Sequence, residues 1–119
     1  MNLTIAEGNL HIEFTFKEQL AAARLHKLWD IPLSHIQQVS TTAPKTTWKE
    51  LRSPGTFIPG WLKGGTYYTE RGKEFWLVYY RRPNYLNIEL HNESYQRIVL
   101  TLEDNEFWQQ RLSEEIKVS

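Results

Sequence analysis

Hydrophobic and polar residues alternate in the first part of the chain, which is the period of a β-strand. Two alternating runs flank the turn-like sequence Glu7-Gly8-Asn9, and a short turn of this composition between such runs predicts a β-hairpin. The apolar positions are Leu3 and Ile5 in the first run, and Leu10, Ile12, Phe14 and Phe16 in the second. We therefore expect the chain to begin with two antiparallel strands.

A helical pattern follows this hairpin. Thr15 precedes Glu18 by three residues, which is the spacing of a capping box, where each side chain satisfies a free backbone N–H group. A run of three alanines also favours a helix. The apolar positions that form one face at helical spacing are Leu20, Ala21, Leu25 and Leu28. These features predict a short helix over residues 17–26.

The remainder of the chain returns mostly to the two-residue period. It predicts strands at residues 29–31, 36–40, 65–69, 73–80, 85–90 and 95–102. Phe75 and Leu77 alternate with Trp76 and Val78, so that strand is apolar on both faces and is expected to be buried on both. Leu86, Ile88 and Leu90 are expected to face inward. Tyr85, Asn87 and Glu89 would then line an exposed sheet edge that is open to self-pairing.

Residues 41–59 form the least regular part of the sequence. Pro44, Pro54, Gly55 and Pro59 predict a long connection, with one turn of helix at residues 48–51. Structureless loops longer than about 15 residues are uncommon unless they are functional or packed down. This connection is therefore a candidate functional element.

The C-terminal segment has the pattern of an amphipathic helix. Asp104 is a suitable N-cap, and Glu106 lies in the first turn, where a negative charge is favourable. Trp108, Leu112 and Ile116 form a single apolar stripe between charged residues. We expect this helix to dock on the β core.

Together these elements predict a mainly β, single-domain protein over residues 1–119. Its expected architecture is a partly open antiparallel β-sandwich or barrel of about seven or eight strands, capped by the C-terminal helix. One extra short helix is expected near residues 17–26.

This succession of elements resembles the pleckstrin-homology (PH) superfold. Residues 31–39 (IPLSHIQQV) are similar to a strand–turn–strand segment of bacterial PH-like domains. Segments of small, uncharacterised bacterial and archaeal PH-like proteins resemble residues 52–60 (RSPGTFIPG), 65–67 (GTY) and 71–76 (RGKEFW). The resemblance covers roughly residues 3–116. The helix at 17–26 and the connection at 41–59 depart from the general PH plan.

The resemblance implies a fold and very little about activity, because one fold serves many functions. Bacterial relatives would rarely meet the phosphoinositides that eukaryotic PH domains bind. It therefore implies protein partners, including copies of the same chain, ahead of lipids.

Composition narrows the class of protein. The chain has 119 residues and no cysteine, and its 14 Lys and Arg balance its 14 Asp and Glu, which argues against a whole-chain polyanion binder. A hydrophobic fraction of 40% excludes a disordered segment. No apolar run approaches the roughly 20 residues of a membrane-spanning helix, and no signal peptide is visible. We expect a cytoplasmic protein, with peripheral membrane attachment as the alternative.

Motifs for catalysis or cofactor binding are absent from the sequence. The four histidines form no i, i+3 or i, i+4 pair, and there is no HExxH motif, GxSxG elbow or P-loop. We therefore expect no metal, no cofactor, no small-molecule substrate and no enzymatic activity.

One electrostatic asymmetry remains. Residues 45–82 carry eight Lys and Arg but only three Glu, which gives a net charge of +5. Three apolar residues of the 54–65 segment and five of these basic residues form a hypothetical binding set. Its members are Phe57, Ile58, Trp61, Lys63, Arg71, Lys73, Arg81 and Arg82. If they form a basic rim with an apolar wedge, the set would bind anionic membrane, since each Lys or Arg near such a surface contributes about 1 kcal/mol. Alternatively, the apolar residues fold back over the sheet, or serve as a protein interface.

A nucleic-acid interface is the weakest of these hypotheses. Aromatic residues on neighbouring strands can stack on bases, as on an RNA-recognition sheet. The strand over 73–80 is apolar on both faces, however, and the net charge is zero. The sequence therefore favours a non-catalytic binding or assembly module with a protein partner or a second copy. Its alternative is a peripheral binder of anionic membrane through the 54–65 segment and the basic turns.

Overall fold

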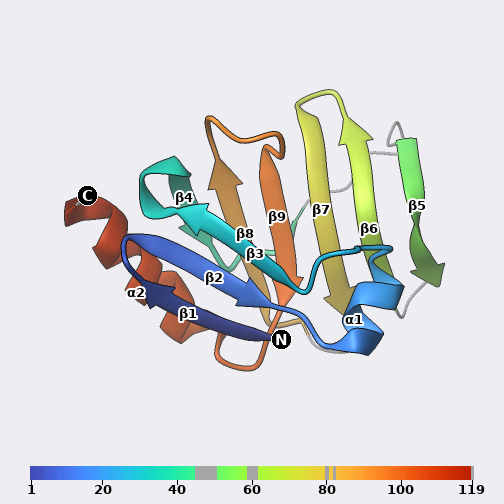
Figure 1. Ribbon diagram of the computed structural model, residues 1–119, viewed down its shortest axis with the longest axis horizontal. Coiled ribbons are helices and arrows are strands. Elements are labelled where there is room, and N and C mark those ends of the chain that lie inside the picture. The colour runs from blue at the N-terminus through green and yellow to red at the C-terminus, as the bar shows by residue number, and fades with distance from the viewer. Residues whose placement is uncertain (45–50, 59–61, 80, 82, 119) are drawn as a thin grey trace.

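The computed structural model describes residues 1–44, 51–58, 62–79, 81 and 83–118, and for 51–58 and 118 it describes the backbone alone. A three-stranded sheet crosses in front of a six-stranded sheet, with one helix near each end of the pair (Figure 1). The strands are β1 (Asn2–Ala6), β2 (Asn9–Glu13), β3 (Leu28–Pro32), β4 (Ile36–Ser40), β5 (Leu51–Ile58), β6 (Leu62–Thr69), β7 (Gly72–Tyr79), β8 (Tyr85–Leu90) and β9 (Arg97–Thr101). The helices are α1 (Phe16–Ala21), a 3₁₀ turn η1 (Leu33–His35) and α2 (Asn105–Val118). The predicted class, mainly β with a C-terminal helix and no closed barrel, is confirmed.

The three-stranded sheet has the order β1-β2-β3. Its first hairpin is the predicted one, and Ala6 pairs with Asn9 across a two-residue turn. Glu7 and Gly8 both have positive φ, 53° and 78°, which is typical of a type I′ turn. The alternation of Leu10 and Ile12 points both side chains into the core.

The six-stranded sheet has the order β4-β8-β9-β7-β6-β5. Its strands pair antiparallel except at one place, because β7 and β9 run parallel. The reason is topological: β8 lies two positions away from β7, and β9 returns from β8 into the position between them. The period of the side chains does not reveal such a crossing, so the sequence predicted only antiparallel neighbours.

The expectation of one long irregular connection over residues 41–59 is wrong for its second half. Residues Leu51–Ile58 form β5, an edge strand that pairs with β6. A register shift between Arg52 and Gly55 spans Pro54, and edge strands with bulges are where a sheet tolerates proline. Residues 48–50 of the predicted helical turn lie outside the described residues.

The main core fills the space between the two sheets. It contains residues from β2, β3, β7, β8, β9 and α2, including Ile12, Phe75, Ile88, Leu100 and Leu112, all at most 1% exposed. A second, smaller apolar cluster of Tyr67, Trp76, Val78 and Val99 lies separately from it. Trp76 and Val78 alternate with Phe75 and Leu77 along β7, so this strand is buried on both faces as predicted.

β8 is an interior strand, and this corrects the expected edge at Tyr85, Asn87 and Glu89. It pairs with β4 on one side and β9 on the other. Asn87 is 3% exposed, and its Nδ2 donates to Thr42 O (2.7 Å) and Ser40 Oγ (3.3 Å). Self-pairing through this strand is therefore excluded. Among the described strands, the edges of the large sheet are β4 and β5.

The two helices differ in how they use their apolar residues. α2 packs on β4, β8 and η1, with Leu112 buried and Trp108 and Ile116 against the core, as predicted. α1 begins with the predicted capping box between Thr15 and Glu18. It ends at Ala21, earlier than expected.

Candidate functional site

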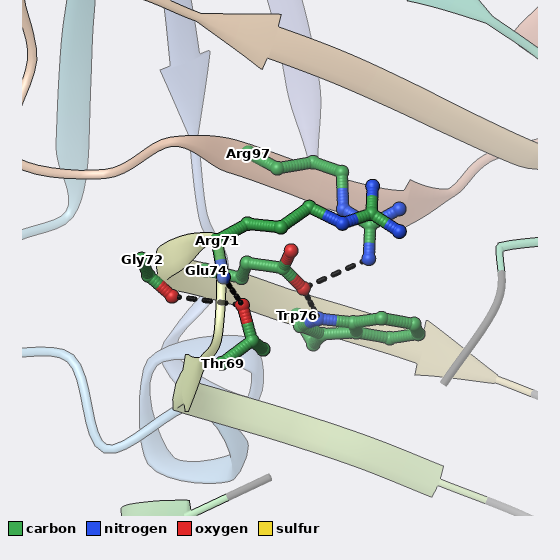
Figure 2. A network of polar contacts seen from close by, with 6 residues as sticks. All are labelled: Thr69, Arg71, Gly72, Glu74, Trp76 and Arg97. Atoms are coloured by element: carbon green, nitrogen blue, oxygen red, sulfur yellow. Dashed lines mark hydrogen bonds and ion pairs between the residues drawn. The ribbon is translucent and has the colours of Figure 1, made fainter. Parts of the chain in front are cut away.

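A buried polar cluster joins three strands of the six-stranded sheet. Glu74 on β7 and Arg97 on β9 are register partners, and both are buried. The Nη2 of Arg97 donates to Glu74 Oε1 at 2.8 Å, and Trp76 Nε1 donates to the same oxygen at 3.0 Å (Figure 2). The carboxylate charge and the guanidinium charge thus compensate each other inside the protein, which is the condition for burying either of them.

Lys63 on β6 belongs to the same region and not to an exposed rim. Its side chain is 3% exposed, and its Nζ lies 3.8 Å from the centroid of the Trp76 ring and 4.3 Å from that of Tyr67. These are cation–π distances. Lys63 therefore does not present its charge to a membrane surface.

The other members of the predicted binding set are dispersed. Arg71 is exposed in the turn between β6 and β7, Arg81 is exposed, and Lys73 lies with its Nζ 4.3 Å from the Tyr95 ring centroid. Within the 54–65 segment, residues 54–58 belong to β5 and residues 62–65 belong to β6, and Ile58 pairs with Leu62. Phe57 and Ile58 lie on β5, where the backbone alone is described, and Trp61 and Arg82 lie outside the described residues.

The segment from residue 16 to residue 28 exposes large apolar side chains. Phe16 and Leu20, one turn apart on α1, are 73% and 63% exposed, and Leu25 and Leu28 are 93% and 54% exposed. The sequence predicted that Leu20, Ala21, Leu25 and Leu28 share one face of a helix over residues 17–26, and that prediction is wrong for Leu25 and Leu28. The helix stops before Leu25, and Ala23 takes a positive φ of 52°, which ends the helical turn.

Ala22 and Arg24 hold this segment against the rest of the protein. Ala22 is 4% exposed and belongs to the main core. The guanidinium of Arg24 lies 4.3 Å from the Trp29 ring centroid, and its Nη2 donates to Leu28 O at 3.2 Å. Burial lowers the pKa of Arg24 from its ordinary value. Small and charged residues thus anchor the segment, while its large apolar residues face outward.

An acidic turn lies on the other side of a cavity from α1. The cavity, of about 470 Å³, is lined by Glu18 from α1 and by Glu103 and Asp104 from the turn before α2. Glu103, Asp104 and Glu106 are exposed, and the neighbouring Phe107 is 56% exposed. The exposed apolar segment and this acidic turn therefore flank the same hollow of the surface.

Two histidines have carboxylate partners. His11 Nδ1 pairs with Asp30 between β2 and β3, and His35 Nδ1 pairs with Glu93. The hydrogen bond to Asp30 raises the pKa of His11 from its ordinary value. Among the described residues, no group of three His, Asp or Glu side chains is placed to hold a metal ion. No helix in the described part is both long and apolar enough to cross a membrane.

Comparison with known proteins found no matching family model, no matching curated protein and no matching solved structure.

Sequence reasoning missed the candidate surface that the structure places around α1. Helical spacing grouped Leu20 with Leu25 and Leu28 on one face, but such spacing does not say whether a face is covered. The capping box correctly marked the start of the helix, but the alanines at 21–23 favoured its continuation and gave no signal of its end at Ala21.

Proposed function

We propose that this protein is a non-catalytic, PH-like binding module that associates with a second copy of itself. The observation that carries the proposal is the exposure of Phe16, Leu20, Leu25 and Leu28. Single exposed apolar side chains are ordinary on protein surfaces, but several in one short segment mark an interaction site. Covering one such side chain contributes about 1.5–3 kcal/mol.

Charge complementarity supports a second copy as the partner. Lys17 and Lys27 are exposed within or beside the apolar segment. Glu103, Asp104 and Glu106 are exposed on the opposite side of the cavity. In a two-fold symmetric dimer, if one surface of the first copy contacts a second surface of its partner, the reverse contact also forms. The basic, apolar segment of each copy would then face the acidic turn of the other.

Sedimentation velocity over a wide range of protein concentration tests the proposal. The wild-type protein is expected to form a dimer that weakens as salt is added. Leu20→Glu and Leu25→Glu are each expected to raise the dimer dissociation constant at least about tenfold, because each places a charge in an apolar contact. Both positions are exposed in the single chain, so both variants should stay folded.

Tyr68→Ser is the matched control. Tyr68 is also a large exposed side chain, at 47%, but it lies near the far end of β6, away from α1 (Figure 1). This variant should dimerise like the wild type. A wild-type protein that is monomeric at every concentration would overturn the proposal.

Peripheral binding to anionic membrane is the second candidate function. The exposed Arg71 and Arg81 support it, whereas the burial of Lys63 removes one charge from it. Co-sedimentation with anionic and neutral vesicles, at low and high salt, separates the two functions. Salt-sensitive binding to anionic vesicles by a monomeric protein, abolished by Arg81→Glu, would replace the self-association proposal with this one.

A further inference from the structure

A second, smaller cavity lies beside the buried polar cluster, away from α1. It has a volume of about 200 Å³. Its polar lining consists of Ser40, Thr42, Arg71, Asn87, Glu89 and Arg97. A space of this size holds a small polar group, since pockets for drug-sized ligands begin near 300 Å³.

Two buried polar atoms in this lining are unsatisfied. Arg97 is 7% exposed, and its Nε has no hydrogen-bond partner among the described residues, although Nη2 is held by Glu74. Asn87 is 3% exposed, and its Oδ1 likewise has none, although Nδ2 has two acceptors. One atom is a donor and the other an acceptor, so a ligand that satisfies both must carry a hydrogen-bond acceptor and a hydrogen-bond donor.

Arg71 brings a second guanidinium to the same cavity. Figure 2 shows its side chain passing Glu74 and ending beside the guanidinium of Arg97. The backbone N–H of Arg71 donates to Thr69 Oγ1. Glu74 compensates the charge of Arg97, whereas the guanidinium of Arg71 has no hydrogen-bond or ion-pair partner among the described residues, and a guanidinium is a favourable donor to phosphate oxygens.

We propose that this cavity binds a phosphate monoester group. Its charged oxygens would accept from Arg71 and from Nε of Arg97, and the P–OH of its singly protonated form would donate to Oδ1 of Asn87. A single water molecule can bridge Arg97 and Asn87 but leaves the charge of Arg71 uncompensated. The inference is independent of self-association, because none of these residues belongs to the segment from 16 to 28.

Glu89 sets the selectivity of this site. It is half-buried in the lining and has no ion-pair partner among the described residues. Its negative charge repels any anion in the cavity. A phosphate group can offset this repulsion through its hydrogen bonds, whereas a halide ion can accept but cannot donate a hydrogen bond. Removing the charge of Glu89 should strengthen phosphate binding, whereas removing the charge of Arg71 should weaken it. The test therefore has two variants with opposite expected effects on affinity.

The experiment is an NMR titration of the isotopically labelled protein with inorganic phosphate, against sodium chloride at equal ionic strength. Phosphate is expected to produce saturable shifts of the Arg97 Nε–H and the Asn87 side-chain amide. Arg71→Ala should weaken phosphate binding about tenfold or more, because it removes a charge-assisted contact. Glu89→Gln should strengthen it several-fold.

Arg111→Ala is the matched control, since Arg111 is an arginine of α2 that pairs with Glu115 and does not line the cavity. It should leave phosphate binding unchanged. Shifts that do not saturate, that chloride reproduces, or that persist unchanged in Arg71→Ala would overturn the proposal. Because Arg71 is exposed, its substitution tests the site without the risk of unfolding that Arg97 carries.

Vesicles identify the source of the phosphate group. Phosphatidic acid carries a phosphate monoester, and phosphatidylserine vesicles of equal charge do not. Binding to phosphatidic acid vesicles alone, lost in Arg71→Ala, would support the proposed site and identify a lipid headgroup as its ligand. Saturable phosphate binding without vesicle binding would support it with a soluble phosphate ester.

Discussion

His11 and Asp30 are register partners on β2 and β3, and their side chains form a hydrogen-bonded pair on the sheet surface. This hydrogen bond raises the pKa of His11 above its ordinary value of 6.5. A raised folded-state pKa means that protonation stabilises the folded state. The contribution is therefore complete below pH 6.5 and disappears as the pH rises through the raised pKa.

We predict that Asp30→Asn returns the pKa of His11 toward its ordinary value. NMR titration of the imidazole signals measures this directly. The substitution should also cost more stability below pH 6.5 than well above the raised pKa, as urea unfolding at the two pH values would show. An unchanged His11 titration in the variant would contradict the assignment.

Glu74 and Arg97 form the buried counterpart of that surface pair. Glu74→Gln keeps a group able to accept from Trp76 but leaves the guanidinium of Arg97 without its counter-charge inside the protein. We predict a loss of about 3–5 kcal/mol in the free energy of unfolding, measured in urea.

The exposed pair of Lys27 and Glu13, 3.6 Å apart, is the comparison for this prediction. Lys27→Ala should cost less than about 1 kcal/mol, because water already solvates both charges. Equal losses in the two variants would show that the burial of Glu74 does not decide its contribution.

At the scale of the element, the β1–β2 turn carries a residue that is poorly suited to its conformation. Glu7 has a φ of 53°, a left-handed conformation that costs most L-residues about 1–2 kcal/mol and that asparagine tolerates better. We predict that Glu7→Asn raises the midpoint of urea unfolding, with a gain of about 1 kcal/mol.

The turn between β6 and β7 provides the control. Glu70, like Glu7, is the first residue of a two-residue turn, but its φ is not positive. Glu70→Asn should therefore bring no comparable gain. If both substitutions were equally stabilising, the effect would arise from the removed charge and not from the backbone.

α1 shows how an element depends on its surroundings. Gly64 on β6 leaves room for it, since a Cβ there would lie 2.8 Å from the carbonyl oxygen of Ala21. The helix thus approaches the sheet through small residues, and Ala22 is the one that is buried. Phe16 and Leu20 on the same helix remain largely exposed.

The whole molecule exposes 7200 Å², and a standard interface takes about 800 Å² from each partner, roughly one ninth of that surface. In Figure 1, α1 and the turn before α2 lie at the same end of the β-strands, and the cavity beside Glu18 is lined by residues of both. A self-complementary interface of standard size would therefore cover that end, while the cavity lined by Arg71 and Asn87 belongs to other elements. The two proposed activities use separate surfaces.

What the sequence determined by itself is most of the strands, the C-terminal helix and the inward faces of these elements. The alternation of Leu10 with Ile12 and of Leu86 with Ile88, and the spacing of Trp108, Leu112 and Ile116, define faces that only burial can satisfy. The capping box at Thr15 is equally local, because both of its partners lie within four residues. Local period and local hydrogen bonding do not depend on where the element is placed.

Only the tertiary structure decided which faces are covered and which residues meet. The order of the strands makes β8 an interior strand and buries Asn87, and the parallel entry of β9 brings Arg97 beside Glu74. The same packing leaves Leu20 and Leu25 uncovered. These outcomes depend on contacts between residues far apart in the chain, and neither hydrophobic period nor turn chemistry encodes the order in which strands assemble.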